Sequence, residues 1–144
     1  MVTIIVGIAT VVAINTFGTA ADQANVDAVR NDVATLASAA QGFYMRPGML
    51  GGGSRTFTGL SFDGLAFPAD GVTATPLTAQ NENGRYTIAV LAPQSFSIVA
   101  DPASCDGYTP GAVDAEGVLT GGTACAAADQ ITATVEPNVF AFDS

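Results

Sequence analysis

The first 21 residues of the chain carry no ionisable side chain, and Asp22 is the first residue that does. A helix over residues 1–21 would rise about 31 Å, which is enough to cross the hydrocarbon core of a bilayer. A bare helix of this composition is unfavourable in water, because burial of its apolar surface in lipid or protein lowers the free energy. The stretch therefore limits the fold to one in which this helix is covered by something outside the globular part.

Residues 1–21 fit three interpretations. A cleaved signal peptide is favoured by the small residues Gly18–Ala21, although no basic segment precedes the apolar run. A membrane span is favoured by the length. A helix buried among copies of itself is favoured by the β-branched side chains and by Gly7, Ala9 and Ala13, which permit tight helix contacts. The last two interpretations are compatible if the segment lies first in the membrane and later in a polymer.

The side chains that we expect to form this membrane or filament-core helix are large and apolar. They are Val2, Ile4, Ile5, Ile8, Val11, Val12, Ile14 and Phe17. Polar or small residues at Asn15, Thr16, Gly18 and Thr19 interrupt them, and these residue types are poor helix formers. Two alternatives stay open: a soft joint at Asn15 and Gly18, or a continuous helix whose polar side chains bond to their own turn.

Residues 22–44 continue as an amphipathic helix, in which polar residues such as Asp22, Asn25 and Asp27 fall mainly on one face. The apolar face consists of Val26, Val29, Val33, Leu36, Ala37, Ala40, Phe43 and Tyr44. Pro47 and Gly48 end the helix.

A glycine-rich connector follows over residues 45–55, with three successive glycines at Gly51–Gly53. A glycine run cradles phosphate where a strand precedes it, a helix follows it and a lysine is present. None of these features is apparent here, so we interpret the run as a flexible connector.

From residue 56 the apolar period changes to two, which predicts an antiparallel β-sheet over residues 56–144. The pair Asn83-Gly84 predicts a hairpin, and Thr78–Gln80 is an alternative part of the strand that enters it. The apolar tail Val139–Phe142 is expected to dock on the head. The predicted strands are Arg85–Leu91, Ser95–Ala100 and Ile131–Val135, and two further segments are predicted as short strands or extended chain, Thr56–Phe62 and Val72–Leu77.

The chain has two cysteines, Cys105 and Cys125. An exported pair usually forms a disulfide, which here would close a loop of about 20 residues and stabilise the fold by about 3 kcal/mol. Two free buried thiols are the alternative. We interpret the acidic side chains between Asp101 and Gln130 as solvated carboxylates rather than a calcium site, because the spacing of an EF-hand loop is absent.

The formal net charge is −9, and all four cationic side chains are arginines; the sequence has no lysine and no histidine. This composition argues against nucleic-acid binding, which depends on clusters of Lys and Arg that neutralise phosphates. Without a histidine, and with both cysteines expected in a bridge, the sequence offers no nucleophile–base pair. We therefore expect a protein that is not an enzyme and that has no cofactor and no metal site.

Taken together, these elements resemble the type IV pilin superfamily. The matching features are the apolar helix Val2–Phe17, its amphipathic continuation Asp22–Tyr44, the connector, the sheet and the loop between Cys105 and Cys125. The resemblance implies an α+β fold in which a long N-terminal helix packs by its second half on a small antiparallel β-sheet head.

The pilin resemblance also implies a division of the chain and a function. Residues 1–21 would serve the membrane and the filament core, and residues 22–144 would form a globular head. The chain would be a structural subunit of an extracellular surface filament, a homopolymer of identical subunits, for adhesion or surface motility. Its precursor would wait in the inner, cytoplasmic membrane. The alternatives are a membrane-anchored monomeric binding module and a pseudopilin of a secretion system.

Two positions depart from the pilin pattern. Pilins typically carry a glutamate near the mature N-terminus, where this chain has Ile5, and often begin with an N-methylated phenylalanine, where this chain has Met1. We expect either that Met1 lies inside a longer precursor or that the chain belongs to a divergent branch. With isoleucine at position 5, the chain lacks the glutamate that would usually set the register between pilin subunits.

Overall fold

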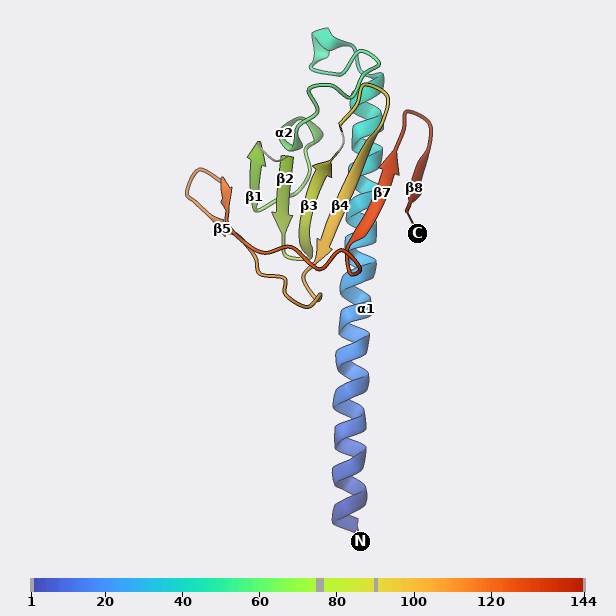
Figure 1. Cartoon of the computed structure of the whole chain (residues 1–144), viewed down its shortest axis with the longest axis vertical. Helices are drawn as coiled ribbons and strands as arrows, with labels where there is room; N and C mark the ends of the chain where they lie inside the picture. The colour runs from blue at the N-terminus through green and yellow to red at the C-terminus, as the bar shows by residue number, and fades with distance from the viewer. Residues whose placement is uncertain (1, 75–76, 90, 144) are drawn as a thin grey trace.

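The structure is a computed structural model that describes residues 2–74, 77–89 and 91–143. One long helix stands against an antiparallel sheet, which gives the predicted α+β fold (Figure 1). Parts of the predictions fall outside this description, namely those on Met1, on the side chain of Val2, and on Thr75, Pro76 and Val90.

Helix α1 (Val2–Met45) has 44 residues and is therefore about 66 Å long at 1.5 Å per residue. Its second half lies against the sheet, while its first half projects beyond the head as a bare rod (Figure 1). The long helix with an apolar first half, packed by its second half on the sheet, is confirmed. The connector after it contains one short 3-10 helix, η1 (Gly48–Leu50).

The main sheet has six strands in the order β1-β2-β3-β4-β7-β8, and every neighbouring pair is antiparallel. The strands are β1 (Gly71–Ala74), β2 (Leu77–Asn81), β3 (Gly84–Ala89), β4 (Phe96–Pro102), β7 (Ile131–Val135) and β8 (Phe140–Phe142). A separate two-stranded arm consists of β5 (Ala112–Val113) and β6 (Leu119–Thr120). The predicted strand Ile131–Val135 and the docking of the C-terminal tail, as β8, are both confirmed.

The core lies between α1 and the sheet. Val29, Val33, Leu36 and Ala40 of the helix are fully buried. Alternate residues of three strands face them, because successive side chains of a strand point to opposite sides of the sheet. These strand residues are Tyr86, Ile88, Phe96, Ile98, Ala133 and Val135. The amphipathic period of residues 22–44 therefore predicts the buried face of the helix correctly.

The predicted strand Thr56–Phe62 is wrong. These residues form a loop that leads into the short helix α2 (Phe62–Leu65), whose N-terminus is capped by the Ser61 hydroxyl. Phe57 is fully buried, and its ring centroid lies 5.0 Å from that of Phe96 in an edge-on arrangement. Apolar residues of a loop thus enter the core one at a time, and they produce the same short sequence pattern as a strand.

The predicted strand Val72–Leu77 is divided between two elements. Its first part belongs to β1 and Leu77 begins β2, so the alternative that places Thr78–Gln80 in the strand entering the hairpin is confirmed. The predicted neighbour Ser95–Ala100 corresponds to β4, which extends two residues further, to Pro102.

The β2–β3 hairpin is confirmed, but its turn lies one residue earlier than Asn83-Gly84. Asn81 pairs with Gly84, so the loop residues are Glu82 and Asn83. The Asn81 Oδ1 atom accepts hydrogen bonds from the N–H groups of Asn83 (3.0 Å) and Gly84 (3.2 Å). A side chain on Gly84 would collide with the carbonyl oxygen of Asp101 in β4, so the glycine is required for the close approach of two strands.

Candidate functional site

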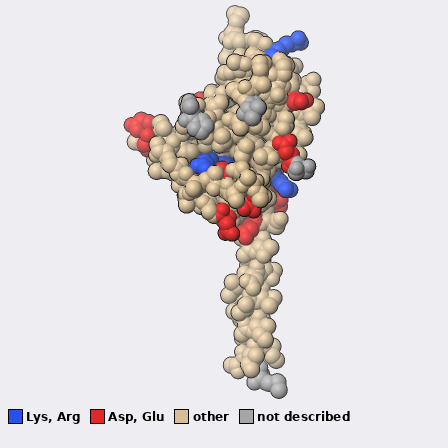
Figure 2. Space-filling model, in the orientation of Figure 1, with Lys and Arg blue, Asp and Glu red and all other residues tan. Residues whose placement is uncertain are grey.

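The exposed first half of α1 distinguishes this molecule from an ordinary globular domain. We call residues 3–21 the stalk; all of them are exposed and none carries a charge. The exposed fraction of its large apolar side chains runs from 58% at Val12 to 76% at Phe17. In the space-filling view the projecting rod shows no acidic or basic side chain, whereas the head shows both (Figure 2).

The stalk is long and apolar enough to cross a membrane. Over 18 residues of α1 the mean hydropathy is 1.9, and none of that window is buried in the structure. Folded monomers rarely expose continuous apolar patches larger than a few hundred Å². The exposed apolar surface of the stalk is continuous and carries no charge, unlike the surface of the head.

One side of the stalk has a shallow hollow of about 410 Å³, lined by Ile4, Gly7, Ile8, Val11 and Val12. Gly7 lies in this hollow, and a methyl group added there would meet no other atom within 4 Å. Glycine costs a helix about 1 kcal/mol relative to alanine. We call the hollow at Gly7 the notch. In lipid or apolar protein it allows a neighbouring helix to approach closely, which improves van der Waals packing.

Three predicted stalk residues do not line this hollow. Ile5, Ile14 and Phe17 are 64%, 64% and 76% exposed. At about 100° per residue Ile5 lies about 20° from Val12 and Ile14 about 20° from Gly7, whereas Phe17 points about 80° away from Gly7. The structure thus does not gather the predicted residues on one face but places apolar surface around the whole stalk.

Three threonine side chains of the stalk bond to their own helix. The hydroxyls of Thr10, Thr16 and Thr19 each donate to the carbonyl oxygen four residues earlier, at 2.8, 2.9 and 3.1 Å. Such bonds make threonine compatible with lipid or apolar protein. Helix α1 is continuous through Asn15 and Gly18 in the structure, which describes the chain alone. The soft joint at these two residues stays a prediction for the assembled state.

A cluster of hydrogen bonds around Asp32 fixes the head to α1. The Asp32 Oδ2 atom accepts from the Nδ2 atoms of Asn81 and Asn83, both at 2.9 Å, and from the Tyr86 hydroxyl at 2.7 Å. Burial alone would raise the pKa of Asp32, but the three donors outweigh it and hold this pKa below its ordinary value of 3.8. Burial and the bond to Asp32 raise the pKa of Tyr86. An ionised Asp32 therefore holds the β2–β3 hairpin on the helix.

Further bonds join α1 to the head near the stalk and at the opposite end. Near the stalk, the Asn25 side chain donates to the Asn83 carbonyl (3.0 Å) and accepts from the Ser104 N–H (3.1 Å). At the opposite end, the Tyr44 hydroxyl lies 2.6 Å from Gln94 Oε1. The attachment of the head thus extends over the whole second half of the helix.

Cys105 and Cys125 form the predicted disulfide, with their Cα atoms 5.9 Å apart. Beside it lies the buried carboxylate of Asp101, which accepts from the Cys125 N–H (3.1 Å) and from Gln130 Nε2 (2.8 Å). Its other oxygen lies 3.6 Å from Arg85 Nε. The bridge and the carboxylate together hold the long segment between β4 and β7 against the sheet.

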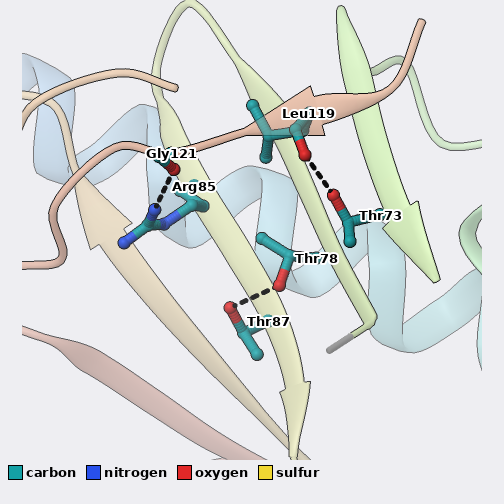
Figure 3. A pocket seen from close by; sticks show the side chains of 6 residues that line it. All are labelled: Thr73, Thr78, Arg85, Thr87, Leu119 and Gly121. Carbon is teal, nitrogen blue, oxygen red and sulfur yellow. Dashed lines mark hydrogen bonds between the residues drawn. The ribbon is translucent and has the colours of Figure 1, made fainter. Parts of the chain in front are cut away.

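A cavity of about 290 Å³ lies on the face of the sheet remote from α1, under the β5–β6 arm. Its lining consists of Thr73, Thr78, Arg85, Thr87, Leu119 and Gly121 (Figure 3). The Thr78 and Thr87 hydroxyls lie 3.2 Å apart, and the Thr73 hydroxyl donates to the Leu119 carbonyl at 2.6 Å. The Arg85 guanidinium donates to the Gly121 carbonyl at 3.5 Å. The polar groups of this cavity are thus bonded to one another.

Within residues 2–74, 77–89 and 91–143, no group of three or more His, Cys, Asp or Glu side chains is placed to hold a metal ion.

Comparisons with protein-family models, with curated proteins and with solved structures give no match. The long apolar helix and the antiparallel sheet are compatible with a pilin-like fold.

Sequence reasoning missed Asp32 and the cavity under the arm. Asp32 lies three residues after Val29 and four before Leu36, so the helical period places it at the edge of the buried face. That signal was present in the sequence. The cavity depends on how the β5–β6 arm packs on distant strands, and no local pattern indicates such a contact.

Proposed function

We propose that the chain is a structural subunit of an extracellular helical filament of the type IV pilus kind, which polymerises through its stalk. The observation that carries this proposal is the charge-free stalk, which projects bare from the folded head. The hydrophobic core begins at Val29, so the head is built without the stalk. The stalk is therefore left to bind outside its own chain.

Burial of the stalk is the driving force of this mechanism. Its eight exposed large apolar side chains, at about 1.5–3 kcal/mol each when fully buried, represent on the order of 10 kcal/mol. The cytoplasmic membrane covers them in the precursor, and neighbouring stalks cover them in the filament. Because lipid is as apolar as a neighbouring helix, the gain on polymerisation comes from close packing, to which the notch at Gly7 contributes.

A charge placed in the stalk tests the proposal. Ile8→Asp or Val12→Asp puts a carboxylate where lipid or a neighbouring stalk would cover it, which costs several kcal/mol. We expect electron microscopy of sheared cell-surface material to show no filaments from either variant. Circular dichroism of the purified chains should show an unchanged head, because neither residue contacts the core.

Two control variants separate the charge from its position. Ile8→Leu keeps the apolar volume, and Val139→Asp adds the same charge on an exposed site of the head. Both should form filaments. Normal filaments from Ile8→Asp and Val12→Asp would contradict the proposal.

A membrane-anchored monomeric binding module is a second candidate, favoured by the presence of a cavity of about 290 Å³ under the β5–β6 arm. In that case the stalk would serve only as a tether. Electron microscopy separates the two candidates, since only the first requires filaments that contain this chain. A pseudopilin of a secretion system would use the same stalk, and long, abundant extracellular filaments would argue against it.

A further inference from the structure

The end of the head remote from the stalk carries an exposed apolar projection flanked by arginines. Met49 and Leu50, in η1, are 99% and 70% exposed. Arg46 and Arg55 lie on either side of them along the chain, and both are exposed. In the described chain the one ion pair is that of Arg85, so neither of these arginines is paired there. We call Arg46, Met49, Leu50 and Arg55 the distal knob.

The opposite end of the head, next to the stalk, is acidic and hollowed. Strands β2 and β4 end there and β7 begins there (Figure 1), and acidic side chains gather on the head around the base of the projecting rod (Figure 2). A hollow of about 460 Å³ at this end is lined by Asp32, Pro68, Ala69, Asp70, Asn81, Glu82 and Asn83. Asp70 and Glu82 are exposed. We call this site the proximal hollow.

The dimensions of the molecule bring these two ends together in a filament. Asn25 and Arg46, the residue after α1, mark the ends of the head along the helix, and their separation of 21 positions corresponds to about 32 Å. Residues 3–24, the free part of the helix, span about 33 Å. If neighbouring subunits are shifted along the filament axis by one head height and rotated about that axis, the distal knob of one subunit lies at the proximal hollow of the next.

We infer that the distal knob of one subunit binds the proximal hollow of a second copy of this chain. The inference rests on the proposed filament and adds to it a second interface, between heads. The two arginines of the knob meet Asp70 and Glu82, while Met49 enters the hollow. Opposite charges favour this head-to-tail contact, and like ends repel each other. The contact sets the axial spacing of subunits in a chain that has Ile5 where pilins carry a glutamate.

Crosslinking tests the contact in assembled filaments. The full-length variant Met49→Cys with Glu82→Cys, treated with a short bismaleimide, should give a ladder of covalent oligomers, because each subunit is linked to the next. Each single substitution, and Met49→Cys paired with Val139→Cys, should give no ladder. The native cysteines do not interfere, because they are bridged. Intact filaments of the first variant without a ladder overturn the inference.

Charge reversal provides a second test. Unfolding of the variants cannot explain its expected result, because a further pair of substitutions restores the lost filaments. Arg46→Glu with Arg55→Glu should lower the filament yield at least about tenfold, since like charges at an interface cost more than 1.4 kcal/mol. Adding Asp70→Arg and Glu82→Arg to the same chain should restore filaments. If the first double variant forms filaments normally while Ile8→Asp forms none, this inference fails and the proposed function stands. A wild-type chain that forms no filaments overturns both.

Discussion

Asp32 joins two elements that are about 50 residues apart in the sequence. It accepts three hydrogen bonds from the β2–β3 hairpin, and each donor comes from a side chain of that hairpin. Hydrogen bonds to an ionised group are roughly twice as strong as those between neutral groups. At the scale of single residues, this carboxylate therefore has a structural function, and it holds the sheet to the helix.

Replacing Asp32 by asparagine should lower the free energy of unfolding by about 1–2 kcal/mol at neutral pH, because a charged acceptor with three donors is lost. Urea unfolding of the full chain in detergent, followed by tyrosine fluorescence, measures this difference. Asp27→Asn changes an exposed carboxylate on the same helix and should leave the free energy of unfolding unchanged.

The contribution of Asp32 depends on pH in a defined direction. Its pKa is lower in the folded chain than the ordinary value of 3.8, so its stabilisation is fully present above that value. It is lost as the pH falls below 3.8 and through the folded pKa. We therefore expect the stability difference between wild type and Asp32→Asn to shrink in acid. A difference that stays constant down to pH 2 would contradict this assignment.

At the scale of elements, the sequence predicted those parts whose signal is local. Helix α1 has a long charge-free stretch followed by a 3.6-residue period, and β7 has a clear alternation, so both were predicted with correct type and position. The stretch Thr56–Phe62 was misassigned because side chains such as Phe57 reach the core from a loop. The β5–β6 arm was not predicted, since strands of two residues leave no periodic pattern.

The segment between β4 and β7 depends on the disulfide. Replacing Cys105 and Cys125 by serine should lower the free energy of unfolding by about 3 kcal/mol, because the bridge closes a loop of 20 residues and restricts the unfolded chain. Thermal unfolding of the full chain with and without reductant measures the effect. The double serine variant should be insensitive to reductant. Equal melting temperatures for the wild type in both conditions would contradict the prediction.

At the scale of the whole molecule, the chain consists of a head that is folded and a stalk that is not covered. A fragment of residues 22–144 keeps every residue of the hydrophobic core. We expect it to be a soluble monomer by size-exclusion chromatography, whereas the full chain should require detergent. Its melting temperature should match that of the head in the full chain, since the stalk adds no core contact. A fragment that unfolds or aggregates would show that the stalk stabilises the head.

The stalk could be recognised from sequence, whereas the knob and the hollow could not. Composition alone marks residues 1–21, because no charge occurs there. The proximal hollow combines residues from α1, the segment before β1 and the β2–β3 turn. Such a site exists only after long-range packing, and one residue such as Asp70 carries no local signal of its neighbours there.

The continuity of α1 also has a mechanical consequence for a filament. If α1 stays continuous in the proposed filament, a pull on the polymer would reach each head along one unbroken helix. The head is fastened to that helix at one end by Asn25 and Asp32 and at the other by Gln41 and Tyr44. Tension is therefore carried in shear, and bonds at both ends must break together before the head separates. A head attached at one end alone would peel away bond by bond, so α1 would act as a tension-bearing rod in the proposed filament.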